Sequence, residues 1–140
     1  MNTDPFDLER FVTAQLPVYD DVLEELRRGR KTSHWIWFIF PQIAGLGQSA
    51  MSQRYAIGSI AEARAYLEHV VLGPRLRESA ALLLATPCTA EEILGPIDAR
   101  KLRSSMTLFH RAAPEEAMFS DVLARFYDGV VDGSTDKLLG

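Results

Sequence analysis

Apolar side chains recur three or four residues apart along most of the chain, which is the spacing of helices that bury one face. The first such stretch covers residues 8–26, and Asp4 and Pro5 in front of it suit an N-cap and a first helical turn. Pro17 falls inside the pattern and predicts either a kink or a junction of two helices. The two arginines and the glycine of residues 27–29 predict the C-terminus.

The segment from Trp35 to Phe40 is uniformly apolar and holds both tryptophans of the chain. Its lack of periodicity leaves a strand and a buried helix both open. Because aromatic side chains bury large areas, we expect this segment at the centre of the core. Gly45 and Gly47 predict a loop after it, and residues 49–55 suit either a polar connection or a short helical turn.

Capping and breaking residues divide the rest of the chain into further helices. A capping box of Ser59 and Glu62 predicts a helix through Val70, and Gly73–Pro74 restarts a helix with an apolar stripe to Leu84. A second capping box, of Thr89 and Glu92, predicts a short helix that ends at Gly95–Pro96. Asp98 is the expected N-cap of a helix to Ala113, and a last clear helix is expected from Pro114 to Gly129. In the tail from Asp132 to Gly140, one turn of helix is expected after Ser134, with little to hold it. The pattern predicts a mainly α, single compact multi-helix domain over residues 1–140, with the aromatic segment Trp35–Phe40 buried.

The composition is that of an ordinary globular protein and narrows the expected partners. Apolar residues make up 47% of the chain and charged residues 24%, and the net charge of −4 speaks against nucleic acid and anionic membranes. The segment Trp35–Phe40 is far shorter than the roughly 20 apolar residues of a membrane span. The N-terminus lacks the residue order of a signal peptide. With Cys88 as the single cysteine, no internal disulfide can form. We therefore expect a cytoplasmic protein.

Four basic residues lie just before the aromatic segment. Arg27, Arg28 and Arg30 with Lys31 suit a phosphate-binding patch, but cations at the end of an acidic helix also stabilise its dipole. The dipole interpretation is favoured for the three arginines. Lys31 is the stronger functional candidate because it stands four residues before Trp35, at the edge of the core.

Ser33 and His34 are neighbours, but no third residue completes a catalytic triad at a telling distance. His34 is expected to line a pocket or to form a hydrogen bond in the core. His69 and His110 are isolated, and no histidine pair has the spacing of a helical metal site. We therefore expect neither a metal nor a cofactor.

The stretch from Gly45 to Ser49 is glycine-rich, but it lacks the Gly-Lys-Ser/Thr of a phosphate-binding loop, so a plain turn is favoured. Further along, Asp98, Lys101 and Ser105 fall along one margin of the apolar face of their helix. A local interpretation is an N-cap and an Asp98–Lys101 pair. A functional one is a polar border to a pocket.

Three hydroxyls on the same helix call for an explanation. Ser104, Ser105 and Thr107 are unfavourable in a helix interior, so they need another reason to be there.

The quoted segments together resemble the bacterial "domain of unknown function 1810" family. The resemblance rests on Ser-His-Trp-Ile-Trp-Phe-Ile-Phe-Pro-Gln at residues 33–42 within the longer block 31–49, on Leu-Gly-Pro-Arg-Leu at 72–76, and on Lys-Leu-Arg-Ser-Ser-Met-Thr-Leu-Phe at 101–109. It implies a small, mainly helical, single-domain fold and no established activity. Some relatives carry a calpastatin label, but calpastatins are disordered and this chain has the apolar content of a folded domain. A weaker similarity is to the NADAR family, which acts on ADP-ribose-type groups. It rests on the helical layout and on residues 83–86, and no catalytic position carries over.

Three functions follow from these residues, in decreasing order of support. The first is a pocket for a small anionic ligand, of which a nucleotide is one candidate, with hydrolysis or group transfer as the reaction class if turnover follows. Its expected lining is Lys31, Ser33, His34, Trp35, Gln42 and Ser49 on one side and Asp98, Lys101 and Ser105 on the other. The alternative is a non-enzymatic protein-interaction or regulatory module, presenting Glu91, Glu92, Glu115 and Glu116. Nucleic-acid binding through residues 27–31 comes third.

Overall fold

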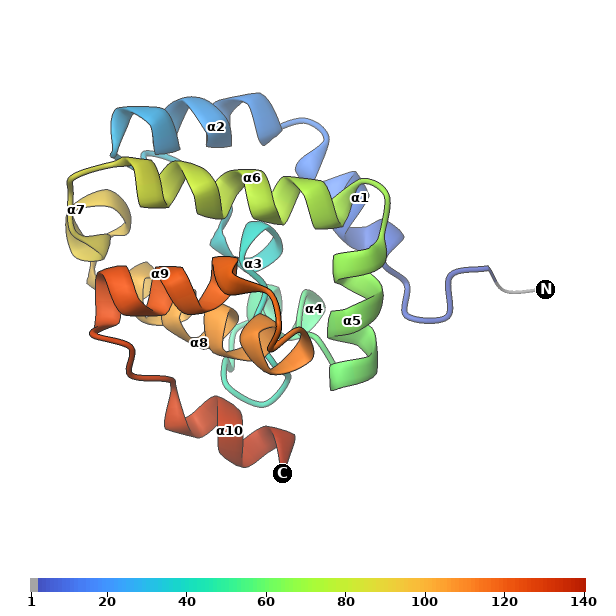
Figure 1. Ribbon diagram of the computed structural model, residues 1–140. Helices are drawn as coiled ribbons and strands as arrows, with labels where there is room; N and C mark the ends of the chain where they lie inside the picture. Colours follow the sequence, from blue (N-terminus) through green and yellow to red (C-terminus); the bar gives the residue numbers. More distant parts are fainter. Residues whose placement is uncertain (1–2) are drawn as a thin grey trace.

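The computed structural model describes residues 3–140, which form ten helices and no strand (Figure 1). One isolated parallel bridge joins Ile43 to Ile57. The helices are α1 (Glu9–Gln15), α2 (Tyr19–Arg28), α3 (Ile36–Ile39), α4 (Ala50–Arg54), α5 (Ile60–Glu68), α6 (Leu72–Ala85), α7 (Ala90–Leu94), α8 (Pro96–Ala112), α9 (Ala117–Tyr127) and α10 (Gly133–Leu139). The prediction of a mainly α fold is confirmed.

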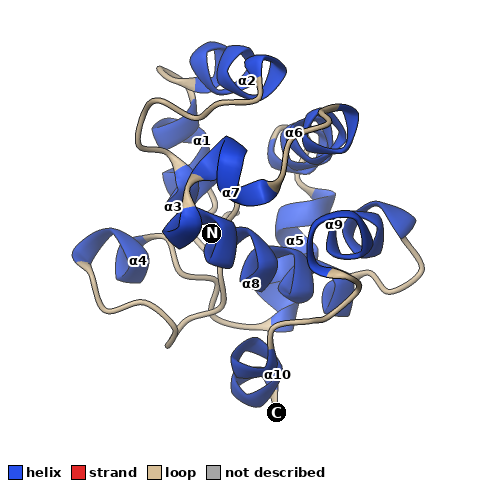
Figure 2. Cartoon of the chain, turned by 90° about the vertical axis from the view of Figure 1, so that its left-hand side faces the viewer, coloured by secondary structure: helices blue, strands red, loops and turns tan. Residues whose placement is uncertain are grey.

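Helix α8 is the longest and lies in the middle of the molecule. It packs against α3, α5, α7, α9 and α10, which surround it in Figure 2. Helix α6 contacts α2, α5 and α9 and so links the first helices of the chain to the last ones. In Figure 1, α2 lies above α6 at the top and α10 lies at the bottom. The burial of nine residues of α8 reflects this central position.

The aromatic segment Trp35–Phe40 is buried and is helical, where its sequence left a strand and a helix both open. Residues 36–39 form a single turn, α3, and the side chains of Trp35 and Phe40 on either side of it are at most 1% exposed. The core continues as a row of rings. Phe11, Tyr66, Phe109 and Phe119 contact one another in that order, with centroids 5.2, 5.3 and 5.8 Å apart. Such pairs add to the free energy gained by burial.

The first helix begins later than predicted. The expectation of a helix from Pro5 is wrong, because Asp7 adopts a left-handed backbone conformation (φ 51°) and α1 starts only at Glu9. The carboxylate of Asp4 still accepts hydrogen bonds from the amides of Leu8 and Glu9, at 2.8 and 3.0 Å. Asp4 therefore caps the helix from a greater distance along the chain than an ordinary N-cap.

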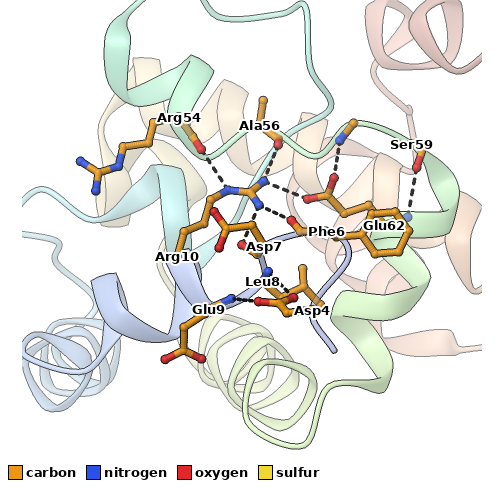
Figure 3. Close-up of polar contacts among 11 residues, drawn as sticks. Asp4, Phe6, Asp7, Leu8, Glu9, Arg10, Arg54, Ala56, Ser59 and Glu62 are labelled. Atoms are coloured by element: carbon orange, nitrogen blue, oxygen red, sulfur yellow. Dashed lines mark hydrogen bonds and ion pairs between the residues drawn. The ribbon is translucent and has the colours of Figure 1, made fainter. Parts of the chain in front are cut away.

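Arg10 fastens this N-terminal turn to the middle of the chain (Figure 3). Its guanidinium donates to the carbonyls of Phe6 and Asp7 behind it, and to Glu62 Oε2 at 2.9 Å. It also donates to the carbonyl at position 54, the last residue of α4, and to that at position 56 in the connection to α5. The planar fork of an arginine suits this kind of multiple anchoring. The hydrogen bonds of Arg10 therefore connect the N-terminal turn to the end of α4 and to the connection between α4 and α5.

Three other helix boundaries lie at helix-breaking or capping residues of the sequence. Pro17 separates α1 from α2, and Ser49 caps α4 by accepting from the amide of Ser52 at 3.1 Å. Ser59 caps α5 as predicted, but Glu62 accepts from the Gly58 amide, so the reciprocal half of the box is missing.

Helix α5 ends at Glu68, before the predicted Val70. The next helix, α6, begins at Leu72, and the ring Nδ1 of His69 in front of it accepts hydrogen bonds from the amides of Val71 and Leu72, at 3.1 and 3.3 Å.

Helix α8 begins at Pro96 and not at Asp98, so the predicted N-cap is wrong. The capping box of Thr89 and Glu92 forms on α7 as predicted, and Gly95 ends that helix and serves as the N-cap of α8. Pro96 takes the first helical position, where its missing amide costs nothing. Asp98 is consequently two residues inside the first turn, and its carboxylate is left to other partners.

The C-terminal tail forms a full helix, α10, and the expectation that little holds it is wrong. Asp132 Oδ2 accepts from Ser104 Oγ on α8 at 3.1 Å and from the amide and hydroxyl of Thr135, which is completely buried. Thr107 Oγ1 accepts from the Asp132 amide at 2.9 Å. Two of the unexplained hydroxyls of α8 therefore anchor the end of the chain. Arg111 adds a double hydrogen bond to the Asp136 carboxylate.

Within residues 3–140, no helix combines the length and the apolar character that crossing a lipid bilayer requires.

Candidate functional site

Two segments that are distant in the sequence, one polar and one mainly apolar but ending in Asp98, meet around one hollow of about 370 Å³. One wall is the loop between α2 and α3, and the other is the junction of α7 and α8. The lining residues are Lys31, Thr32, Ser33 and His34 on the first wall and Leu94, Gly95, Pro96, Ile97 and Asp98 on the second. The hydrogen bond from the Lys31 amide to the Ile93 carbonyl, at 2.7 Å, holds the two walls together.

An ion pair joins the two walls. Lys31 Nζ lies 2.8 Å from Asp98 Oδ2, and the Lys31 side chain is only 7% exposed. On the other side, Lys101 Nζ lies 4.0 Å from Asp98 Oδ1. Two lysines therefore share one carboxylate, and this cluster of three charges has a net charge of +1.

Each of these lysines also lies over a tryptophan ring. Lys31 Nζ is 5.0 Å from the ring centroid of Trp35, and Lys101 Nζ is 5.2 Å from that of Trp37. Such contacts favour the charged ammonium through the negative face of the ring. The alternation Trp-Ile-Trp thus places one indole under each partner of Asp98.

A buried carboxylate shapes the loop that carries the hollow's first wall. Glu25, 4% exposed, accepts from the amides of Thr32 and Ser33 at 2.6 and 2.9 Å, from Ser33 Oγ at 2.6 Å, and from Trp35 Nε1 at 3.1 Å. Burial by itself would raise the pKa of Glu25, but the hydrogen bonds from Ser33, Thr32 and Trp35 outweigh it and lower the pKa from 4.5 to about 2. Glu25 is therefore ionised at neutral pH and holds the loop in one conformation.

Sequence reasoning missed Glu25, although a signal for it exists. Its acidic neighbours at positions 20, 21 and 24 suggest a solvated face. However, position 25 is three residues after Val22 and adjacent to Leu26, so it lies on the apolar stripe of α2. A carboxylate on such a stripe needs a buried partner.

The structure brings four of the nine predicted site residues to the hollow. These are Lys31, Ser33, His34 and Asp98, while Lys101 reaches the cluster through Asp98 without lining the hollow. The other four do not line the hollow, although the Trp35 ring lies beneath Lys31. Trp35 is buried against Glu25, the Gln42 carbonyl accepts from Ile57 in the bridge, Ser49 caps α4, and Ser105 is completely buried on α8.

Three further hollows lie on the described surface. One of about 390 Å³ is lined by Arg64, Arg77 and the α8–α9 connection, and another of the same volume by Arg64, Arg111 and the end of α10. In both, the arginines other than Arg64 are paired with carboxylates, Arg77 with Glu116 and Arg111 with Asp136.

The third, of about 360 Å³, lies between α2 and α6 and contains Arg27, Arg28 and Cys88. Neither Arg30 nor Lys31 lines it, so the basic run of the sequence divides between two hollows. Within residues 3–140, no group of three or more histidine, cysteine, aspartate or glutamate side chains is placed to hold a metal ion.

Of the four glutamates predicted to form a protein-interaction surface, two have partners within the fold. Glu92 belongs to the capping box of α7, and Glu116 forms the ion pair with Arg77. Glu91 and Glu115 are exposed. A protein-interaction surface on these residues stays a prediction.

Comparison with known proteins places this fold among uncharacterised relatives. A model of the family described as "Protein of unknown function (DUF1810)" matches residues 5–139. Among solved structures, the crystal structure of a conserved hypothetical protein from Mycobacterium tuberculosis is similar, with a TM-score of 0.95 and 54% sequence identity. That match covers 97% of this chain and 98% of the other. No curated protein matches the chain.

Proposed function

This chain belongs to the DUF1810 family of proteins of unknown function, and from that premise we propose that it binds a small anionic ligand in the Lys31–Asp98 hollow. The observation that carries the proposal is the meeting of Lys31 and Asp98, which are 67 residues apart in the sequence, beside a shared hollow. Its volume of about 370 Å³ falls at the low end of the roughly 300–1,000 Å³ typical of ligand sites.

The electrostatics of the hollow favour an anion. Lys31 and Lys101 together exceed the charge of Asp98 by one positive unit, and Lys31 is nearly buried, so water screens it weakly. The N-terminus of α8 lines the same hollow and has no side-chain cap. The positive end of its dipole adds to the attraction. His34, exposed at the rim, offers a further hydrogen bond.

A phosphate-bearing molecule matches these groups, and nucleotides and sugar phosphates are the compounds to test. If the protein turns its ligand over by hydrolysis or group transfer, Lys31 would serve as the electrophilic cation beside the anion. Asp98 would then act as the base. Release of inorganic phosphate from a bound monoester would test this enzymatic extension.

The binding proposal is tested by an NMR titration of the backbone amides of residues 31–34, 94, 95, 97 and 98 with inorganic phosphate, AMP and glucose 6-phosphate. Binding should perturb these amides first. Replacing Lys31 with Met should weaken the affinity at least about tenfold, and His34→Ala about threefold to tenfold, because they remove one charge-assisted and one ordinary hydrogen bond. Lys137→Ala, on the exposed face of α10, is the matched control and should bind like the wild type.

His34→Ala is the more telling variant, since His34 is exposed and its loss leaves the fold unaffected. The proposal fails if no compound perturbs these amides, or if Lys31→Met, His34→Ala and the control all bind equally well.

A further inference from the structure

We infer that the ligand of this hollow is amphipathic, with an anionic group beside Lys31 joined to an apolar or aromatic group that packs on Ile97. The inference rests on the proposed anion binding and adds the class of molecule that carries the anion. It comes from the second wall of the hollow, where the lining changes from charged to apolar within a few residues.

Ile97 is an apolar side chain in an unusual place. It is 66% exposed although it stands in the first turn of α8, directly before Asp98. Single exposed apolar residues are common on protein surfaces and by themselves mean little. Within residues 3–140, however, the other large apolar side chains with high exposure are Leu16, Val70, Val130 and Leu138, and none of these lines any of the four hollows described above.

The neighbours of Ile97 extend the apolar wall. Leu94 and Pro96 line the same side of the hollow, and Leu94 belongs to the hydrophobic core. The wall is therefore backed by packed side chains, so a group placed on it would displace water from Ile97 and Pro96. Removing apolar surface from water is favourable in proportion to its area.

The two walls together favour a molecule with an anionic group at one end and an apolar group at the other. A bare phosphate ion would satisfy Lys31 and leave Ile97 in water. A sugar phosphate would turn hydroxyl groups toward Ile97 and Pro96, where they find no hydrogen-bond partner. An aromatic or alkyl phosphate monoester places its charge at Lys31 and its apolar part on Ile97. The volume of about 370 Å³ accommodates one ring beside the anion.

Three probes separate these cases in an isothermal or NMR titration of the wild-type protein. They are inorganic phosphate, glucose 6-phosphate and phenyl phosphate. Phenyl phosphate should bind at least about fivefold more tightly than the other two, since burying a ring face adds a favourable apolar contact. The amides of residues 94, 95, 97 and 98 should shift more with phenyl phosphate than with inorganic phosphate.

The variant Ile97→Ser should remove this preference by weakening the binding of phenyl phosphate. Because Ile97 is exposed, the substitution does not disturb the core. Val130→Ser, an equally conservative change at an exposed position outside the hollow, should keep the preference.

The outcomes distinguish the inference from the proposal on which it rests. Equal affinities for the three probes, or a preference that survives in Ile97→Ser, would overturn the amphipathic ligand while the anion site stands. If none of the probes binds at the hollow, both are wrong.

Discussion

The carboxylate of Glu25 accepts a hydrogen bond from the indole N–H of Trp35 at 3.1 Å, inside the core and ten residues apart in the sequence. The same carboxylate holds the two amides between them, so a loop is folded around a single buried charge. This loop is the first wall of the hollow, and Lys31 and His34 stand on it. The geometry of the candidate site therefore depends on Glu25, which does not line the hollow.

Replacing Glu25 with Gln should lower the free energy of unfolding by about 1–3 kcal/mol. A neutral amide keeps one acceptor oxygen but turns an NH₂ group toward donors that the carboxylate satisfied, and hydrogen bonds to charged groups are the strong ones. Urea unfolding measures the difference. Glu24→Gln, one residue earlier and exposed, is the matched control and should change the free energy of unfolding by no more than about 0.5 kcal/mol. Similar losses in both variants would contradict the anchoring role.

The contribution of Glu25 to stability should disappear in acid. Its pKa lies at about 2 in the folded protein, below the ordinary value of 4.5, so the folded state favours the ionised form. The stabilisation is fully present above about pH 5 and is lost as the pH falls from there toward 2. The difference in unfolding free energy between wild type and Glu25→Gln should be constant from pH 6 to 8 and shrink at pH 4 and 3. A difference independent of pH across this range would show that the charge does not matter.

Gly73→Ala should be strongly destabilising. An added Cβ would lie 2.2 Å from the Leu67 carbonyl oxygen and 2.8 Å from Arg77 Nη1, which itself donates to that carbonyl. Backbone cannot yield as a flexible side-chain end can, so the end of α5 must move, at a cost of about 2–3 kcal/mol in unfolding free energy. Gly133→Ala, where an added Cβ meets nothing within 4 Å, should be neutral or stabilising by up to about 1 kcal/mol. Thermal denaturation of both variants checks the contrast, and equal melting temperatures would refute it.

Asp132→Ala should loosen the attachment of α10 to α8. The substitution removes the acceptor for Ser104 and for both polar groups of Thr135, so the N-terminus of α10 loses its cap and its bond to Ser104, and keeps the bond from its backbone amide to Thr107. We expect the amides of residues 133–139 to exchange hydrogen at least about tenfold faster, because a lost cap alone costs about 1 kcal/mol. Asp121→Ala on the exposed face of α9 serves for comparison. Unchanged exchange at α10 would mean that the Arg111–Asp136 pair and the bond from the residue 132 amide to Thr107 suffice to hold it.

The sequence predicted correctly those helix boundaries that depend only on residues close to one another in the chain. The break at Pro17 and the capping box of Thr89 and Glu92 appear in the structure because each is complete within a few residues. Where a local choice depended on a distant partner, the prediction failed. Asp98 looked like an N-cap, yet its carboxylate pairs with Lys31, and Pro96 two residues earlier begins the helix.

The hydroxyl groups of α8 likewise depend on a partner that is distant in the sequence. Ser104 and Thr107 were recognised as needing a reason, but that reason is Asp132, which is 28 and 25 residues away. For the site, the sequence indicated the two segments that meet, and four of nine lining residues. Trp35 was predicted to stack on the ligand and Ser105 to border the pocket from the margin of its helix, but tertiary packing buries both, and Gln42 and Ser49 have contacts elsewhere.

The placement of the two indoles has a practical consequence. The chain has no other tryptophan, and one ring lies beneath each lysine that shares the Asp98 carboxylate. All ultraviolet emission excited near 295 nm (about the red edge of indole absorption) therefore originates beside this cluster of charges. The protein carries its own optical probe of the Lys31–Asp98 neighbourhood, and an anion arriving there would be visible without any dye or label.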